Sequence, residues 1–292
     1  MPRATTTERS RAMKRTNNGI LIPDVPIMAG GNLPNAVKGM SVGGELDPFD
    51  IATPFYIRVY TTLHVLDNAA IQISDNARSW KPLTAGTLTR GKHYFRTTET
   101  ASCLLSTIVD NSHDEYYDIG GNINSLTQAD FADRDNPPTN TNIFNGMKIV
   151  SAAELRMTTY FSATNHYQAA FRGCIHLTKS PLLLVVQTLT QECYESMFYG
   201  CSALTTVPVI QFDGVTKQHS MKNMFAYSGI TESPVLRVTT WGLWACESMF
   251  DSCSNLTKII CISSVPQSDG TYNWCRNVAA AGVFVKKRGE SW

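Results

Sequence analysis

The sequence is poor in charged residues, and its net charge is close to zero. Charged residues make up 17% of the 292 residues, and the formal net charge is +1, whereas about 25% charged residues is usual for a soluble domain. Such a balance provides no field that would attract nucleic acid or a membrane surface. We therefore expect other protein subunits to cover part of the surface.

The sequence also lacks several motifs that are typical of enzymes and metal proteins. It contains no Gly-x-Gly-x-x-Gly, no complete Walker-type loop and no His-Glu-x-x-His. No two cysteines are spaced as Cys-x-x-Cys, which argues against zinc. The acidic stretches 110–118 and 130–135 do not match a calcium-binding loop and are expected to be solvated turns. We expect no catalytic residues, no cofactor and no metal.

One pair of residues has the composition of a nucleophilic dyad. Cys193 and His166 are the only candidates, and no third residue is available to orient them. The histidines near the repeats follow the repeat spacing, so packing or surface roles are favoured over catalysis.

No hydrophobic run reaches the roughly 18 residues that a membrane span requires. The N-terminal stretch has basic residues but no apolar segment after them, so it does not match a secretory signal. A protein exported by the secretory route would need such a signal.

What the sequence does contain is an internal repeat. Five phenylalanines, at positions 144, 171, 198, 225 and 250, are 27, 27, 27 and 25 residues apart. A period in the twenties predicts one supersecondary unit per repeat, stacked on its neighbours around a shared core. Repeat stacks usually present a surface to a partner, so a binding or assembly protein is expected.

Each repeat predicts a short helical segment followed by a strand. Gln191 to Tyr199 is expected to form one or two helical turns, with Cys193 and Met197 on one face. The Thr, Val and Ile residues that follow the repeat leucine suit a strand. The cysteines of the repeat are expected to be reduced packing residues. The predicted repeat core consists of Phe144, Phe171, Cys174, Leu177, Phe198, Cys201, Leu204, Phe225, Ile230, Phe250, Cys253 and Leu256.

The pattern Phe-x-x-Cys-x-x-Leu resembles the BspA-type leucine-rich repeats of gut Bacteroidetes and their phages. The resemblance extends to Gly-Asn-Ile-Asn-Ser-Leu at 121–126, to Asn-Trp-Cys at 273–275 and to Gly-Val-Phe-Val-Lys-Lys at 282–287. It covers about residues 54 to 292. It implies a leucine-rich-repeat fold and adhesion or surface recognition, and it implies no catalytic residues.

Together these observations predict an α+β fold in five parts. Residues 1–53 form an extended anchoring arm, 54–126 a small β-sandwich and 127–142 a connector. Residues 143–262 form a leucine-rich-repeat solenoid of about five repeats, and 263–292 a C-terminal cap.

The N-terminal arm is the expected assembly anchor. Residues 1–16 are basic, and residues 17–53 mix Gly, Pro and Asn with apolar residues, which suits a segment laid along another surface. Protein partners are favoured over nucleic acid because the basic stretch has no aromatic residues. The expected anchor residues are Arg3, Arg9, Arg11, Lys14, Arg15, Ile20, Leu21 and Ile22.

Aromatic residues in or beside the repeats are the expected ligand face. Tyr and Trp offer flat apolar faces with a polar group, which suits sugar rings and protein surfaces. The candidates are Tyr194, Tyr199, Tyr227, Trp241 and Trp244, with Tyr272 beside them.

Bacterial adhesins of the repeat class that the chain resembles need export, whereas a phage particle releases its proteins by lysis and needs no secretory signal. The resemblance together with the missing signal therefore favours a bacteriophage virion structural protein, of the capsid decoration or head or tail fibre type. It would be anchored to other virion proteins through residues 1–53, form a homo-oligomer, and bind host-surface glycan or protein from the virion surface. The alternative is a leucine-rich-repeat adhesin that is secreted or lies on a bacterial cell surface. An enzyme would need an active site that the sequence does not locate.

Overall fold

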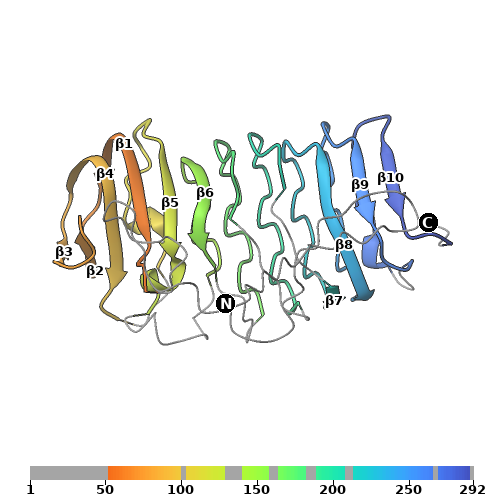
Figure 1. Ribbon diagram of the computed structural model, residues 1–292, viewed down its shortest axis with the longest axis horizontal. Coiled ribbons are helices and arrows are strands. Elements are labelled where there is room, and N and C mark those ends of the chain that lie inside the picture. Colours follow the sequence, from red (N-terminus) through yellow and green to blue (C-terminus); the bar gives the residue numbers. More distant parts are fainter. Residues whose placement is uncertain are drawn as a thin grey trace, which may run out of the picture. The chain divides into compact units, whose positions relative to one another are not determined.

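The structure is a computed structural model that describes residues 52–99, 103–128, 140–157, 164–181, 189–207, 213–265 and 269–289. All of them belong to one compact unit, which spans Gly39–Trp292. In that unit one sheet lies at the N-terminal end, a second sheet lies at the C-terminal end, and stacked turns of chain connect them (Figure 1).

The first sheet has six strands in the order β3-β2-β4-β1-β5-β6. Successive side chains of β1 face opposite sides of the sheet. Those of Ile57, Val59, Leu63 and Val65 face the core, and the side chains between them lie on the outer face. The strands are β1 (Tyr56–Val65), β2 (Asn68–Ser74), β3 (Lys81–Leu83), β4 (Gly86–Thr97), β5 (Tyr117–Asn122) and β6 (Ile149–Arg156).

A short 3-10 helix, η3 (Ile123–Leu126), is buried and forms hydrogen bonds with the backbone of this sheet. The Phe55 N–H donates to the Ser125 hydroxyl oxygen at 2.8 Å, and that hydroxyl donates to the Phe95 carbonyl at 2.9 Å. A single buried serine therefore joins the backbones that lead into β1 and run through β4. Another 3-10 helix, η2 (Leu105–Thr107), precedes β5.

The second sheet has four parallel strands in the order β10-β9-β8-β7. They are β7 (Asp213–Val215), β8 (Glu232–Thr240), β9 (Lys258–Cys261) and β10 (Val283–Lys286), with the 3-10 helix η4 (Asp269–Thr271) between the last two strands. Each of these strands comes from a different copy of the repeat.

Between the sheets, the segments around the repeat phenylalanines stack as a turn ladder. We use this name for the stretches 140–147, 164–174, 190–201, 219–228, 244–253 and 269–278. The Phe198 N–H donates to the Met224 carbonyl of the next copy at 2.8 Å, whereas the adjacent Met197 N–H donates to the Tyr194 carbonyl three residues earlier at 3.2 Å. This alternation recurs from copy to copy, so backbone donors are satisfied alternately within a turn and between turns.

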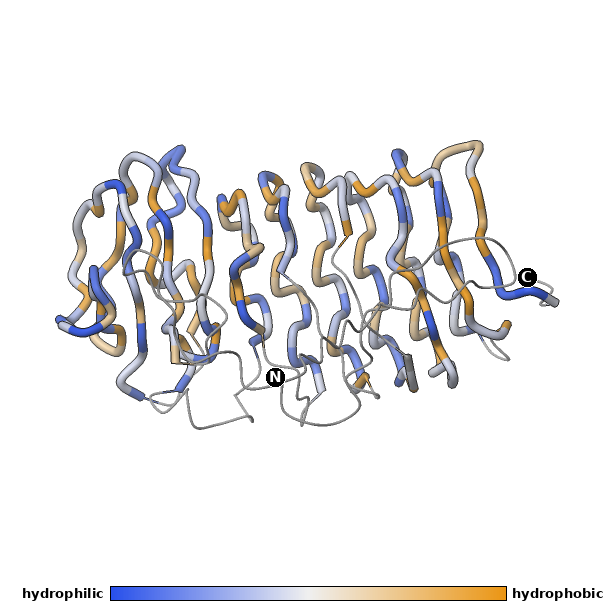
Figure 2. The backbone as a smooth tube through the Cα atoms, viewed as in Figure 1, coloured by the Kyte–Doolittle hydropathy of each residue, from blue (hydrophilic) through white to orange (hydrophobic). Residues whose placement is uncertain are grey.

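The turn ladder requires left-handed backbone at every fourth residue. In the copy around Phe198, φ is +57° at Glu192, +56° at Ser196 and +72° at Gly200. Such values are uncommon for residues other than glycine. The left-handed residues change the direction of the backbone after each turn, so the chain does not continue into an α-helix. Hydrophobic and hydrophilic stretches accordingly alternate along each turn (Figure 2).

A row of aromatic rings runs from the core of the first sheet through the turn ladder to Phe284 of β10, which is 39% exposed. The centroids of neighbouring rings lie 4.9 to 6.4 Å apart, and the three pairs from Phe171 to Phe250 are nearly parallel. The row consists of Phe95, Phe55, Phe144, Phe171, Phe198, Phe225, Phe250, Trp274 and Phe284.

The residues expected in the repeat core are all buried, with at most 2% of their surface exposed. The thiols in this set also make a repeated contact. Cys174 donates to the Phe144 carbonyl at 3.0 Å, and Cys201 donates to the Phe171 carbonyl at 3.1 Å. Cys253 makes the same bond at 2.9 Å to the phenylalanine one copy earlier. Each thiol therefore connects its own copy to the preceding one.

The predicted α+β fold with a β-sandwich and a leucine-rich-repeat solenoid is wrong. The regular secondary structure of the described residues is mostly β, their only helices are short 3-10 turns, and their strands form two sheets. The segment 191–199 was expected to be helical because Cys193 and Met197 are four apart. A run of turns with a four-residue period gives the same spacing, and the left-handed residues exclude the helix.

The expected sandwich is a single sheet, and its sixth strand, β6, comes from the segment assigned to the repeats. Phe55 stacks on Phe144 at 6.0 Å, so the core continues across that expected boundary. Within the part of the chain that the structure describes, no helix is long and apolar enough to cross a membrane.

The thiols provide a first test of this packing. Seven of the eight cysteines are buried and only Cys275 is exposed. Burial raises the pKa of the Cys174 and Cys193 thiols to about 12, so they hold almost no reactive thiolate at neutral pH. We expect Ellman's reagent to modify one thiol per native chain, and the remaining seven only after denaturation. Cys275→Ser should bring the native count to zero; fast reaction of several native thiols would contradict the packing.

A second test concerns the left-handed turn position at Gly200. A Cβ there would meet only backbone atoms of Gly173, at 3.9 Å or more, so any cost comes from φ. Tyr227 and Asn277 hold corresponding positions with φ of +59° and +55°. We expect Gly200→Val to lower the free energy of unfolding by about 1–2 kcal/mol more than Gly200→Asn, because left-handed backbone is costly for β-branched residues. Urea denaturation of both variants measures the difference; equal values would contradict it.

Candidate functional site

The turn ladder exposes a regular set of positions. In each four-residue turn two side chains point into the core and two point outward, as in the copy around Phe198, where Cys193, Tyr194 and Met197 are buried while Glu195 and Ser196 are half-buried. Because copies stack directly, outward side chains of successive copies form columns along the surface.

Two adjacent columns create a cleft of about 450 Å³ over the last three copies. Each copy contributes two residues three apart: His219 and Lys222, then Trp244 and Glu247, then Asp269 and Tyr272. The cleft therefore has an aromatic ring on two copies and a charged group on all three.

Contacts within the cleft fix its charged groups. Lys222 Nζ lies 2.9 Å from Glu247 Oε2, and His219 Nε2 lies 3.6 Å from the same oxygen. The second distance is too long for a hydrogen bond but supports electrostatic attraction when the imidazole is protonated. His219 also stacks on Trp244, with centroids 5.5 Å apart and 10° between the ring planes. The indole is thus held flat against the wall of the cleft.

The backbone at this site has the same left-handed geometry as the rest of the turn ladder. φ is +54° at His219 and +51° at Trp244. Equivalent positions in earlier copies, Asn165 and Glu192, have φ of +61° and +57°. The unusual conformation therefore belongs to the turn geometry and is not a strain specific to this cleft.

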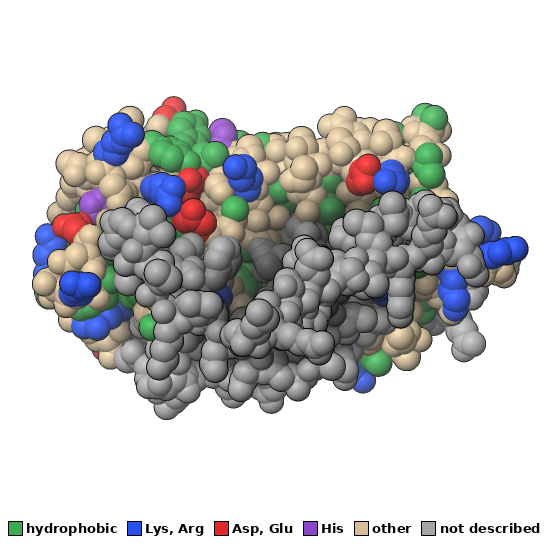
Figure 3. Space-filling model, in the orientation of Figure 1, with side chains coloured by type: hydrophobic (Ala, Val, Ile, Leu, Met, Phe, Trp, Pro, Cys, Tyr) green, Lys and Arg blue, Asp and Glu red, His purple; other side chains and the backbone are tan. Residues whose placement is uncertain are grey.

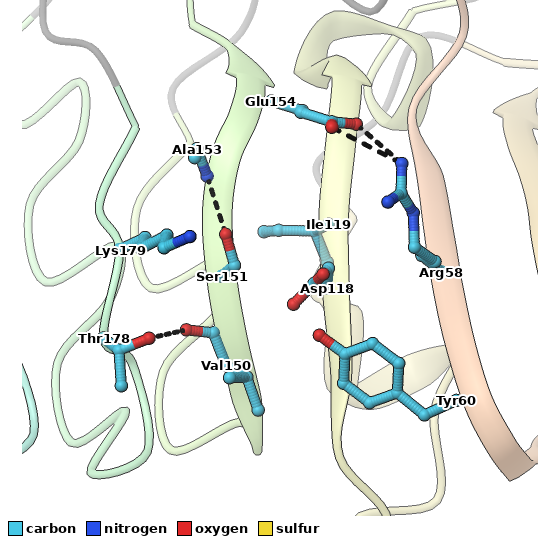
Figure 4. A pocket seen from close by; sticks show the side chains of 10 residues that line it. All are labelled: Arg58, Tyr60, Asp118, Ile119, Val150, Ser151, Ala153, Glu154, Thr178 and Lys179. Carbon is cyan, nitrogen blue, oxygen red and sulfur yellow. Dashed lines mark hydrogen bonds and ion pairs between the residues drawn. The ribbon is translucent and has the colours of Figure 1, made fainter.

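A second cleft, of about 350 Å³, lies on the outer face of the first sheet (Figure 4). Its acidic groups have partners within the protein, whereas Lys179 has no ion-pair partner among the described residues. Glu154 accepts hydrogen bonds from Tyr56 and from Arg58, the latter at 3.0 Å. The Tyr60 hydroxyl points toward Asp118 (Figure 4), and burial together with a hydrogen bond to Asp118 raises the pKa of Tyr60.

Acidic and basic side chains accordingly lie next to each other over β1, β5 and β6 (Figure 3). The Arg58–Glu154 pair joins β1 to β6, and the Tyr60–Asp118 hydrogen bond joins β1 to β5. This second cleft is a weaker candidate for a binding site than the cleft on the turn ladder, which has the two aromatic rings of Trp244 and Tyr272.

The expected ligand face is only partly at the surface. Tyr194 was expected to face outward, which is wrong: it is 1% exposed and stacks on Tyr167 at 6.3 Å. Trp241 is half-buried against the core, and its Nε1 donates to the Ser264 carbonyl at 2.9 Å. Both residues lie beside outward positions in sequence, but the turn geometry directs their rings elsewhere.

Tyr199, Tyr227 and Trp244 do reach the surface. Tyr199 and Tyr227 pair at 5.2 Å in a separate column, where the Arg172 guanidinium lies 4.9 Å from the Tyr199 ring centre. Trp244 lies in the cleft together with Tyr272. The four polar cleft residues were not among the residues expected from the sequence, although each lies three residues from another cleft residue in its own copy. These residues are His219, Lys222, Glu247 and Asp269.

The expected assembly anchor lies outside the described residues. This applies to Arg3, Arg9, Arg11, Lys14, Arg15, Ile20, Leu21 and Ile22. The sequence also contains Gly-x-Ser-x-Gly at residues 39–43, a spacing found at hydrolase nucleophiles, and these residues likewise lie outside the described ones.

The candidate dyad has the wrong electrostatics for nucleophilic catalysis. Burial lowers the pKa of His166 to about 4, and burial raises the pKa of Cys193 to about 12. Both groups are therefore neutral near pH 7, whereas a catalytic thiol needs a lowered pKa. The Cys193 thiol points toward the Ser220 carbonyl, 3.8 Å away.

Comparisons with known proteins add no assignment. No family model, no curated protein and no solved structure matches the chain.

The lowered pKa of His166 predicts a pH dependence of stability. An unfolded chain binds a proton at this histidine below about pH 6.5, whereas the folded chain does so only near pH 4. Stability should therefore fall as the pH drops from 6.5 to 4, by up to about 3 kcal/mol from this group. His166→Ser, which copies Ser220 at the corresponding position, should flatten this slope even if it lowers stability at pH 7. Urea denaturation at several pH values measures the slopes; parallel curves would contradict the prediction.

Proposed function

We propose that this protein is a non-catalytic structural protein of a bacteriophage particle that binds a surface glycan of the host through the cleft of the turn ladder. The observation that carries the proposal is the arrangement of Trp244 and Tyr272 beside Lys222, Glu247 and Asp269 in one cleft. Flat aromatic faces bind the apolar faces of sugar rings, and fixed charged groups bind their hydroxyls.

The rigidity of the cleft supports this proposal. Trp244 is held by its stack on His219, and Glu247 is held by Lys222. Side chains that are fixed before binding lose little conformational entropy when a ligand arrives. A glycan of repeating units would also match a surface on which side chains recur from copy to copy.

Two further observations support placement in a virion. The chain is poor in charged residues, which favours a surface partly covered by other subunits. All eight cysteines are free, which agrees better with assembly inside a cell than with export into an oxidising environment. In this proposal residues 1–53 attach the protein to other virion proteins. The test is to probe purified phage particles with an antibody against this chain. If the particles do not contain the chain, the virion assignment is wrong.

The glycan proposal predicts a specific loss of binding. The full chain is first screened against an array of bacterial surface polysaccharides, and the best ligand is then titrated by calorimetry. Trp244→Ala should weaken binding at least tenfold, about 1.4 kcal/mol, because it removes the flat apolar wall of the cleft. Tyr272→Ala should weaken it as well.

Tyr227→Ala is the matched control, since this ring is 50% exposed on the same turn ladder but outside the cleft. It should bind like the unaltered chain. Equal losses in Trp244→Ala and Tyr227→Ala, or no polysaccharide bound at all, would overturn the glycan assignment.

A further inference from the structure

Two histidines on the outer face of the first sheet form an unusual pair. The rings of His64 and His113 stack with centroids 4.0 Å apart and 12° between their planes. His64 is near the end of β1 and His113 is in the loop before β5. A neutral imidazole ring has one nitrogen lone pair that can bind a metal ion.

A carboxylate completes the group. Glu115 Oε1 lies 2.8 Å from His64 Nδ1, and Glu115 Oε2 accepts a hydrogen bond from the His64 backbone N–H at 2.7 Å. One ligand atom from each of His64, His113 and Glu115 lies within 4.8 Å of the other two. Around a tetrahedral zinc ion with bonds of about 2.0–2.2 Å, ligand atoms are about 3.3 Å apart. Small side-chain rotations would therefore bring the three groups to bonding distance.

The backbone already holds these groups in place. The Asp110 N–H donates to the His64 carbonyl at 3.0 Å, and the Glu115 N–H donates to the His113 carbonyl at 2.9 Å. Lys148 Nζ donates to the same His113 carbonyl at 2.6 Å, and it pairs with Asp114 at 2.9 Å. Contacts from β1, from the loop and from Lys148, the residue just before β6, thus restrict the site before any ion binds.

The site is open to solvent on one side. The side chains of His64 and His113 are 38% and 44% exposed, whereas that of Glu115 is 11% exposed. An ion can therefore enter from solution and keep a water ligand. Asp110 offers a further oxygen nearby, since its Oδ2 lies 3.5 Å from His113 Nδ1.

We propose that His64, His113 and Glu115 form a zinc-binding site that clamps the loop 110–115 onto β1. Two imidazole nitrogens and one carboxylate oxygen are a donor set that Zn²⁺ accepts in proteins. Ca²⁺ and Mg²⁺ prefer all-oxygen sets, so they should bind poorly here. The site lies on the first sheet and is independent of the glycan cleft on the turn ladder.

Calorimetric titration of the full, EDTA-treated chain with zinc chloride at pH 7.5 tests the proposal. We expect one saturable Zn²⁺ site per chain, with no comparable heat from Mg²⁺ or Ca²⁺. His64→Gln and His113→Gln should each weaken binding at least tenfold, and Glu115→Gln should weaken it as well. Replacement by Co²⁺ should give the visible absorption of a four-coordinate ion, which a loosely bound surface ion would not show.

Two controls keep the result interpretable. The titrations are carried out in a Cys275→Ser background, because the exposed thiol is an alternative zinc ligand. His93→Gln removes a histidine that pairs with a single carboxylate, Asp75, at 2.6 Å and lies outside the three-residue group; it should leave zinc affinity unchanged. Absence of saturable zinc binding, or binding that survives in both His64→Gln and His113→Gln, would overturn the proposal.

Discussion

The turn ladder depends on the sharing of backbone hydrogen bonds between copies. Each turn satisfies half of its N–H groups internally and half with the next copy, as Met197 and Phe198 illustrate. Neither half is sufficient alone, because buried N–H groups without partners are costly. The copies must therefore stay in register, and the aromatic rings and thiols of one copy then come to lie on those of the next. The left-handed residues persist because the bonds on both sides leave no alternative conformation.

This constraint also explains how the chain tolerates irregular copies. The spacing from Phe225 to Phe250 is 25 residues instead of 27, yet the Phe225 N–H still donates to the Met249 carbonyl at 2.9 Å. The shortening falls between the turns and leaves their hydrogen bonds intact. Where Ser228 replaces the repeat cysteine, its hydroxyl lies 3.6 Å from Cys253 and keeps a polar contact in the same column. The identity of the outward-facing side chains can vary more between copies, since these side chains do not set the register of the stack. The residues of the cleft around Trp244 are at such outward positions.

The aromatic spacing allowed the repeated positions to be identified from the sequence, because a residue that must stack on its own equivalent has to recur at a fixed interval. The same reasoning could not decide between a helix and a run of turns. Cys193 and Met197 are four apart in both, and only the φ angles at Glu192 and Ser196 distinguish them. The expected ligand face contains a separate error. Tyr194 was expected at the surface as an aromatic ring within a repeat, whereas the structure places it in the core.

Both proposed sites depend on residues that are far apart in the sequence. His64 and His113 meet because β1 and the loop before β5 are adjacent in the first sheet, and the cleft around Trp244 joins residues from three copies. The sequence by itself determined the period and the identity of the buried columns, since a core selects residue types locally and repeatedly. Only the tertiary structure decided the path of the backbone, the sharing of strands between segments, and which polar groups face each other. These features depend on hydrogen bonds between distant residues, and no local pattern encodes them.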